Sequence, residues 1–221
     1  MVSGWDGQTN RKLSRVDVLK QMQRLLVTGV WKPGQVVQEQ LLAAELNVSK
    51  TPVREALQLM ALQGMVKPVS RVGYIVTDID LADMVEVFHY RSLLETDLIV
   101  QRAALPGNLG VVTEPSGADE KPMAMDREAE FHRTLYASLT PSRRQASLSV
   151  LVDQTSRAMV YVGLSESLLA LLHNEHEQIE AAVIDRDLEL ARSLMVVHLS
   201  HLRDSVLAKL RQQLRERENL V

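Results

Sequence analysis

The stretch that decides the fold runs from residue 42 to residue 57 and reads Leu42-Ala43-Ala44-Glu45-Leu46-Asn47-Val48-Ser49-Lys50-Thr51-Pro52-Val53-Arg54-Glu55-Ala56-Leu57. A helical pattern over 38–46 stops at Asn47-Val48-Ser49 and restarts over 51–63. Ser49 or Thr51 suits the capping position of the second helix, and Pro52 suits its first turn, where the missing N–H is not needed. Two helices joined by so short a turn indicate a helix-turn-helix.

The segments on either side extend this unit. Before it, apolar residues recur at helical spacing over 15–28, until glycine and proline break the pattern. After it, two β-like runs over 65–69 and 74–77 are joined by a short turn, which predicts a small hairpin. Three helices and a hairpin in this order predict a winged helix-turn-helix over 15–77, and the polar residues 1–14 read as a flexible leader.

The rest of the chain has a helical texture. Only 4% of all residues are aromatic, which favours packed helices over a sheet. Helical patterns cover 80–104, 123–139, 142–163, 165–185 and 187–217. We therefore predict a mainly α protein. Its second domain, 78–221, is expected to be an all-α antiparallel helical bundle interrupted by a loop over 106–122.

Charge is divided unevenly along the chain. The net charge is -3 at pH 7, of which residues 1–77 contribute +5 and the remainder -8. A basic head on an acidic body indicates that only the head meets a polyanion, although chance clustering gives the same pattern. The chain has no cysteine, no signal-peptide layout at its start and no run of about 20 apolar residues. We expect a cytoplasmic protein that does not cross a membrane.

The start of the second helix of the helix-turn-helix is suited to DNA, because that end enters the major groove in such proteins. Lys50 suits a phosphate or guanine contact, and Arg54 has the fork that pairs with O6 and N7 of guanine. The exposed backbone N–H groups at this end also favour an anion such as a phosphate. The alternative for each basic residue is a solvated surface charge.

The same stretch resembles the GntR family of bacterial regulators, whose motif is matched by the run from Val48 to Leu57. Lys50 stands where Arg is usual and Gln58 where Arg is frequent, so we expect a different operator preference. Arg71 and Gly73 match the wing that the family lays along the minor groove. The resemblance implies DNA contacts from Lys50, Thr51, Pro52, Arg54, Gln58, Arg71 and Gly73.

All six histidines lie in the second predicted domain, 78–221. Glu128 and His132 stand four residues apart, on one face of a predicted helix, and His176 and His198 belong to two others. Side chains from three helices could converge in a bundle core, and imidazoles with a carboxylate suit zinc, nickel, manganese or iron. The alternative is that these histidines are surface residues or satisfied core residues.

Residues 80–210 resemble the helical (FCD) ligand-binding domain of the FadR-type branch of the same family. The matching features are Arg91-x-x-x-Glu95, Phe131-His132, Glu175-His176-x-x-Ile179, and Asp187-x-x-x-Ala191 leading to His198-Leu199. In that branch an Asp and three His hold a divalent metal on the floor of an effector cavity. The resemblance therefore implies the set Glu128, His132, His176 and His198, in which the extra methylene of Glu128 moves the carboxylate. His173 and His201 each lie one turn from a member of the set.

A metal with open coordination positions would suit a small carboxylate as effector. Arg91, Arg133 and Arg157 lie on predicted helices near the expected cavity and could pair with such an anion. The alternative for each arginine is an intrahelical or surface ion pair, such as Arg91 with Glu95.

These patterns favour a transcription regulator that binds double-stranded DNA and whose operator affinity is controlled by a small organic acid. One recognition helix contacts little DNA, so we expect a homodimer on a palindromic operator, with a hinge at 77–80. The alternatives are an architectural DNA-binding dimer without effector and a metal-dependent helical enzyme. We expect no catalytic residue, because the sequence shows no nucleophile with a partnered base and no phosphate-binding glycine loop.

Overall fold

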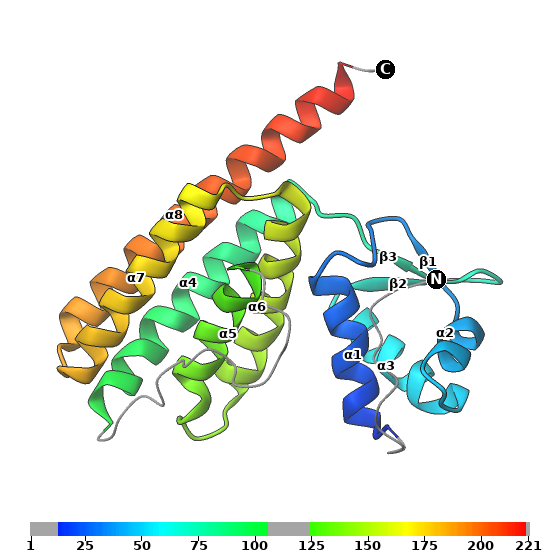
Figure 1. Cartoon of the computed structure of the whole chain (residues 1–221), viewed down its shortest axis with the longest axis horizontal. Coiled ribbons are helices and arrows are strands. Elements are labelled where there is room, and N and C mark those ends of the chain that lie inside the picture. The colour runs from blue at the N-terminus through cyan, green and yellow to red at the C-terminus, as the bar shows by residue number, and fades with distance from the viewer. Residues whose placement is uncertain (1–12, 106–123, 220–221) are drawn as a thin grey trace. The chain divides into compact units, whose positions relative to one another are not determined.

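A computed structural model of the chain describes residues 13–105 and 124–219. In these ranges the chain forms eight helices and three strands, which belong to two compact units that divide between Ile79 and Asp80 (Figure 1). The predicted loop over 106–122 lies outside the described residues, as does the predicted leader up to residue 12. Ser14, assigned to the leader from the sequence, caps the first helix instead.

Three helices build the first unit: α1 (Arg15–Val27), α2 (Glu39–Glu45) and α3 (Lys50–Leu62). α1 begins with a reciprocal cap, in which the Ser14 hydroxyl accepts from the Asp17 N–H and the Asp17 carboxylate accepts from the Ser14 N–H. Apolar residues at helical spacing make one face of α1 and one face of α3 buried, and the two helices pack together. The buried residues are Val18, Met22 and Leu26 of α1 and Val53, Ala56, Leu57 and Met60 of α3.

The wing is a three-stranded antiparallel sheet, whereas the sequence predicts only a two-stranded hairpin. β2 (Val66–Val69) and β3 (Gly73–Val76) form that hairpin, and β1 (Val36–Val37) pairs with the other edge of β3. β1 leaves no signal in the sequence because two residues are too few to show an alternating pattern. Gly73 has φ 121°, and a Cβ at this position would lie 2.7 Å from the carbonyl oxygen of Val37. Only glycine fits where β1 and β3 approach so closely.

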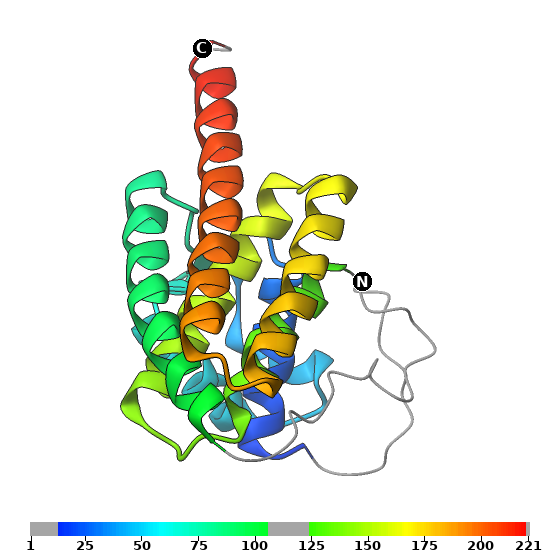
Figure 2. The ribbon, with the colours of Figure 1, turned by 90° about the vertical axis from the view of Figure 1, so that its left-hand side faces the viewer.

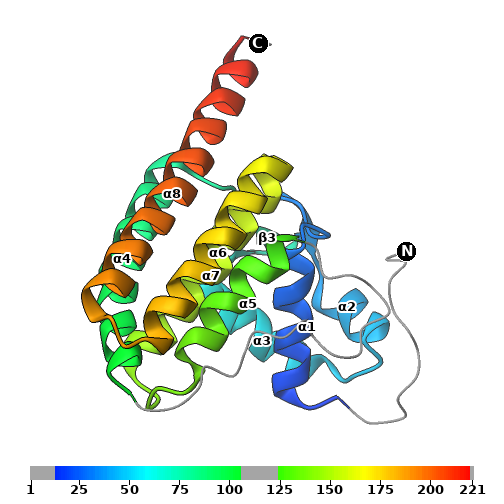
Figure 3. The same ribbon diagram turned by 60° about the vertical axis from the view of Figure 1, so that its left-hand side comes forward.

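Five helices build the second unit: α4 (Leu81–Ala104), α5 (Ala124–Ala137), α6 (Arg143–Val162), α7 (Glu166–Ile184) and α8 (Leu188–Glu218). Side chains of Asp80, Ser142, Ser165 and Asp187 cap the starts of four of them. α8 packs against α4 and α7, and α7 also packs against α5 (Figure 3). The mainly α fold, with a winged first domain and a helical second domain, is confirmed, and each predicted helix ends within two residues of the observed one.

The longest helix, α8, runs past the ends of its neighbours in the helical unit (Figure 2). Leu207 and Leu210 are still buried, whereas Leu214, further along, is 39% exposed. Among the described residues, no helix combines the length and the apolar character that crossing a membrane would need.

Candidate metal centre and nucleic-acid interface

Four side chains of the helical unit converge on one point: Glu128 and His132 from α5, His176 from α7 and His198 from α8. All four are buried, and one carboxylate oxygen and three imidazole nitrogens lie within 4.8 Å of one another. The four-residue spacing places the first two on one face of α5. α7 packs against both α5 and α8. His176 of α7 and His198 of α8 therefore lie close to this face of α5. The structure thus gathers the four residues that the resemblance singles out.

The spacing of these atoms fits the ligands of one metal ion. Nε2 of His198 lies 3.2 Å from Nε2 of His132 and 3.3 Å from both Nε2 of His176 and Oε1 of Glu128. The Glu128 carboxylate lies 3.0 Å from Nε2 of His176 and 3.1 Å from Nε2 of His132. Ligands bound at about 2.1 Å stand roughly 3.0 to 3.4 Å apart at adjacent coordination positions. The extra methylene of Glu128 therefore still leaves its carboxylate inside the cluster.

Two further carboxylates orient the imidazoles. Nδ1 of His132 contacts the Glu95 carboxylate, and Nδ1 of His198 lies 3.0 Å from Oε2 of Glu175. When Nδ1–H donates to a carboxylate, Nε2 of the same ring presents its lone pair, which is the arrangement common among metal-binding histidines. The ring of His176 is held differently, since it stacks on Phe131 with the ring centroids 3.7 Å apart.

The electrostatics of the cluster favour a bound cation. Burial raises the pKa of Glu128, but the three histidines lower it well below its usual range, so this buried group is a carboxylate. Burial also lowers the pKa of both His176 and His198. For His176 burial prevails and the pKa falls to about 4, whereas Glu128 and Glu175 raise the pKa of His198 to about 9. Nη2 of Arg91 lies 3.4 Å from Oε1 of Glu128, and a proton on His198 or a metal ion adds a second positive charge beside this carboxylate.

The sequence predicts Glu95 only as a possible ion-pair partner of Arg91 and assigns no role to Glu175, and it predicts no contact of either residue with a histidine of the cluster. They meet histidines 37 and 23 positions away, which no local spacing reveals. Glu95 also pairs with Arg91, and its pKa falls to about 2 because His132 and Arg91 together outweigh burial. The available signal was the position of Glu95 on the apolar stripe of α4, three residues before Leu98, where a charged pair has to be explained.

The three arginines considered for effector contact have other partners or positions. Arg91 is fully buried and its Nε lies 2.5 Å from Oε1 of Glu95, so the ion-pair alternative describes this residue. Arg133 pairs with Asp153 on α6, and Arg157 is buried on the same helix. None of the three lines the hollow that adjoins the cluster.

That hollow, of about 230 Å³, is lined chiefly by α5 and α7. Glu128 and His176 form part of its wall, so a small ligand inside it would reach the point where the four side chains converge. His173 also lines it but is 59% exposed and pairs with Glu177 rather than with the cluster. His201 contacts Glu175 and likewise stays outside the set of four.

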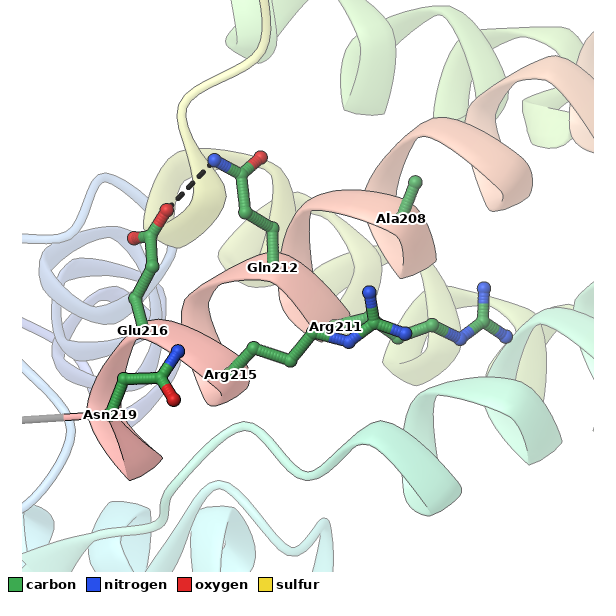
Figure 4. Close-up of a pocket in the computed structure, with 6 residues that line it drawn as sticks. All are labelled: Ala208, Arg211, Gln212, Arg215, Glu216 and Asn219. Carbon is green, nitrogen blue, oxygen red and sulfur yellow. Dashed lines mark hydrogen bonds between the residues drawn. The ribbon is translucent and has the colours of Figure 1, made fainter.

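A second hollow, of about 350 Å³, lies along the C-terminal half of α8 (Figure 4). Its lining residues are Ala208, Arg211, Gln212, Arg215, Glu216 and Asn219, and the side chains of Gln212 and Glu216 hydrogen-bond at 2.8 Å. All of them belong to α8 or, in the case of Asn219, to its C-cap, so within the described residues no second element converges on this hollow as a binding site requires. We assign no site to it.

In the first unit, the start of α3 is open to an anion. Of the two residues that the sequence offers as cap, Ser49 and Thr51, Ser49 occupies the capping position, yet its side chain makes no capping hydrogen bond. The first N–H groups of α3 therefore have no side-chain acceptor from their cap. Lys50, Thr51 and Gln58 are exposed, and Pro52 lies half-buried in the first turn.

The two basic side chains of α3 contact the first turn of α2. Nζ of Lys50 donates to Oε1 of Gln40 at 3.1 Å, and Nε of Arg54 donates to Oε2 of Glu39 at 2.9 Å. The Arg54 side chain nevertheless remains 56% exposed. In the wing, Arg71 is exposed in the turn between β2 and β3, with φ 63°.

Comparisons with known proteins agree with these two units. Residues 15–76 match the model of the bacterial regulatory proteins of the gntR family, and residues 86–201 match the model of the FCD domain. A helix-turn-helix transcriptional regulator from an unstable DNA locus of Streptomyces ambofaciens is 29% identical over 90% of this chain and 87% of its own. The transcriptional repressor GlaR of Escherichia coli is 22% identical over 85% of this chain and 93% of its own.

The fold has a solved counterpart in McbR/YncC of E. coli. The two structures have a TM-score of 0.67 at 18% sequence identity, and the match covers 91% of this chain and 99% of the other. At this identity the likeness concerns the fold alone.

Proposed function

The chain belongs to the GntR family of bacterial regulatory proteins and carries an FCD domain, and from this premise we propose that a small organic acid, bound at a metal in the helical domain, controls its affinity for an operator. Membership makes the chain a transcription regulator with a DNA-binding domain. The relatives compared above are regulators and not enzymes, so the enzyme alternative falls away.

The DNA-binding half of the proposal assigns α3 to the major groove. Lys50 and Thr51 stand at its exposed start, where the uncapped N–H groups favour a phosphate. Arg54 and Gln58 lie one and two turns further along, at positions that would face base edges. Arg71, at the turn of the wing, would contact the backbone or the minor groove. Pro52 and Gly73 would support this interface through the conformation of the backbone rather than through side-chain contacts. Gly73 is required where β1 and β3 approach closely.

The observation that carries the effector half is the convergence of Glu128, His132, His176 and His198 beside a hollow. Three imidazoles and a carboxylate suit zinc, nickel, manganese or iron. Such an ion would supply positive charge and open coordination positions to a carboxylate in the hollow. The hollow beside the cluster also favours an effector-binding protein over a purely architectural one, because it offers a small ligand access to these side chains.

We further infer a homodimer acting on a palindromic operator in the cytoplasm, since a single recognition helix buries too little surface for specific binding. GlaR is named a repressor, and we propose that this chain also represses transcription. The acid would act by binding two arrangements of the protein with different affinity, because only differential affinity shifts an equilibrium.

The test combines metal content with DNA binding. The purified protein and the variant His132→Ala/His198→Ala would be compared by elemental analysis, with His173→Ala as the control that removes a histidine beside the cluster but outside it. A DNA duplex selected from a random library by the full chain would then be titrated with and without a series of small carboxylic acids.

We expect one transition metal per chain in the wild type and in His173→Ala, and loss of the metal in the double variant. We also expect at least one acid to change the affinity for the selected duplex, and only when the metal is bound. Equal metal content in all three proteins would refute the site. No selected sequence at all would refute the DNA-binding half.

A further inference from the structure

The first turn of α2 contacts both basic residues at the start of α3. Glu39 and Gln40 are neighbours in the sequence, and they meet Arg54 and Lys50, which stand four residues apart on one face of α3. Arg54 contacts the charged carboxylate of Glu39, whereas Lys50 contacts the neutral amide oxygen of Gln40. The contact with Glu39 is therefore the stronger of the two constraints on the side chains that α3 presents.

The geometry of the Arg54 contact leaves part of the guanidinium available. Nε donates to Oε1 and Oε2 of Glu39 at 3.2 and 2.9 Å, and Nη2 lies 2.9 Å from Oε2. Glu39 thus occupies one edge of the guanidinium. Within residues 13–105 and 124–219, Nη1 takes part in no side-chain hydrogen bond or ion pair, and the arginine side chain is 56% exposed while that of Glu39 is 23% exposed.

We propose that Glu39 is a specificity-determining residue that positions Arg54 for reading a base, an inference that rests on the proposed binding of α3 in the major groove. A free arginine side chain loses conformational entropy when it is fixed in one geometry. Glu39 fixes the guanidinium before DNA arrives. Nη1 and the remaining N–H of Nη2 form the end of the fork, which is the part that pairs with O6 and N7 of guanine.

Glu39 also disfavours contacts between Arg54 and the phosphates of the DNA backbone. Its carboxylate lies beside a cation at a surface that meets phosphates, so it repels the DNA backbone and competes with it for Arg54. Phosphate contacts carry no sequence information, whereas base contacts do. Removal of Glu39 should consequently strengthen binding to arbitrary DNA and weaken the preference for the selected sequence. A residue that only stabilised the fold would not produce these two opposite changes.

The chain offers a matched control on the same helix. Glu45 is an exposed carboxylate at the end of α2 and forms no ion pair within the described residues. Glu39→Ala and Glu45→Ala therefore remove the same charge, but only the first removes the partner of Arg54. Arg54→Ala shows how much discrimination the arginine provides, and the double variant Glu39→Ala/Arg54→Ala shows whether the two residues act together.

Affinities of the full-length proteins would be measured by fluorescence anisotropy at several salt concentrations. The two probes are the library-selected duplex and a shuffled duplex of the same base composition. Circular dichroism and thermal unfolding would verify that each variant is folded, and Glu39→Gln, which keeps one acceptor, would serve as the milder replacement.

For Arg54→Ala we expect the ratio of the two affinities to fall by about 5- to 150-fold, the discrimination provided by a bidentate pair. Glu39→Ala should lower the ratio by about tenfold while raising affinity for the shuffled duplex, and Glu39→Gln should fall between it and the wild type. In the double variant the loss should not exceed that of Arg54→Ala alone. Glu45→Ala should leave the ratio unchanged.

An unchanged ratio in Glu39→Ala, with a lowered ratio in Arg54→Ala, would overturn the role of Glu39 and leave the proposed DNA contact intact. A higher ratio in Glu39→Ala would also overturn it, because the ion pair would then restrain Arg54 from binding. If Arg54→Ala itself kept the wild-type ratio, the failure would lie in the proposed contact of α3 with DNA.

Discussion

Nδ1 of His198 lies 3.0 Å from Oε2 of Glu175, although the two residues stand on different helices. A carboxylate at this distance fixes the tautomer and the orientation of an imidazole whose Nε2 belongs to the cluster of four. Glu175→Gln removes the charge but keeps the shape. We expect metal affinity to fall by about 10- to 100-fold, measured by competition with a chelating dye.

The control for this substitution is Glu177→Gln on the same helix. Glu177 is exposed and pairs with His173, outside the cluster. Its replacement should leave metal affinity unchanged. Equal affinities for the two variants would show that Glu175 does not orient His198.

Arg91 is a buried cation that compensates two buried carboxylates. It contacts Glu95 at 2.5 Å and lies 3.4 Å from Oε1 of Glu128. Arg91→Met would leave Glu95 without its cationic partner, so we expect a loss of about 3 to 5 kcal/mol in the free energy of unfolding. Urea denaturation measures this loss, and a change below about 1 kcal/mol would contradict the assignment. Arg91→Lys should rescue only part of it, because lysine lacks the fork.

Gly73 provides a test of the sheet. Gly73→Ala combines a positive φ with a Cβ at 2.7 Å from the Val37 carbonyl oxygen. Gly34→Ala also meets a positive φ, of 78°, but no atom lies within 4 Å of its Cβ. We expect thermal unfolding to show a loss of about 1 kcal/mol for Gly34→Ala and a loss of about 3 kcal/mol for Gly73→Ala. Equal losses would mean that the approach of β1 does not constrain this position.

The ion pair of Arg133 with Asp153 predicts a pH dependence. Burial raises the pKa of Asp153 and Arg133 lowers it, with a net rise, so Arg133→Met should raise this pKa further. A carboxyl whose folded pKa exceeds its unfolded value stabilises the fold below the unfolded pKa, of about 4, and loses that contribution as pH rises through the folded pKa.

Between about pH 4 and pH 7, the free energy of unfolding should therefore fall more in Arg133→Met than in the wild type, by about 1 kcal/mol, since Arg133 is partly exposed. Urea denaturation at a series of pH values gives the difference. Arg144→Met is the control, because its pair with Asp97 is half exposed on both sides. Parallel pH profiles for Arg133→Met and the wild type would exclude the effect.

Local rules were sufficient to predict the helices and the hairpin, because apolar residues repeat at 3.6 or 2 positions along them. β1 was not predicted, because its two residues form a strand only by pairing with β3, which lies far from them in the sequence. In the candidate metal centre, resemblance supplied the four residues, and the structure supplied their meeting point and the roles of Glu95 and Glu175. Those roles depend on contacts between helices, as does the pairing of Arg54 with Glu39, and no spacing along one helix contains them.

His198 lies in the interior of α8, which continues without a break to Glu218. At 1.5 Å per residue, these two positions are about 30 Å apart along one rod. A tilt of about 5° at His198 displaces the far end of such a rod by about 3 Å. The helix that contributes a side chain to the buried cluster is therefore also a lever arm, which magnifies small movements of that side chain at a surface far from it.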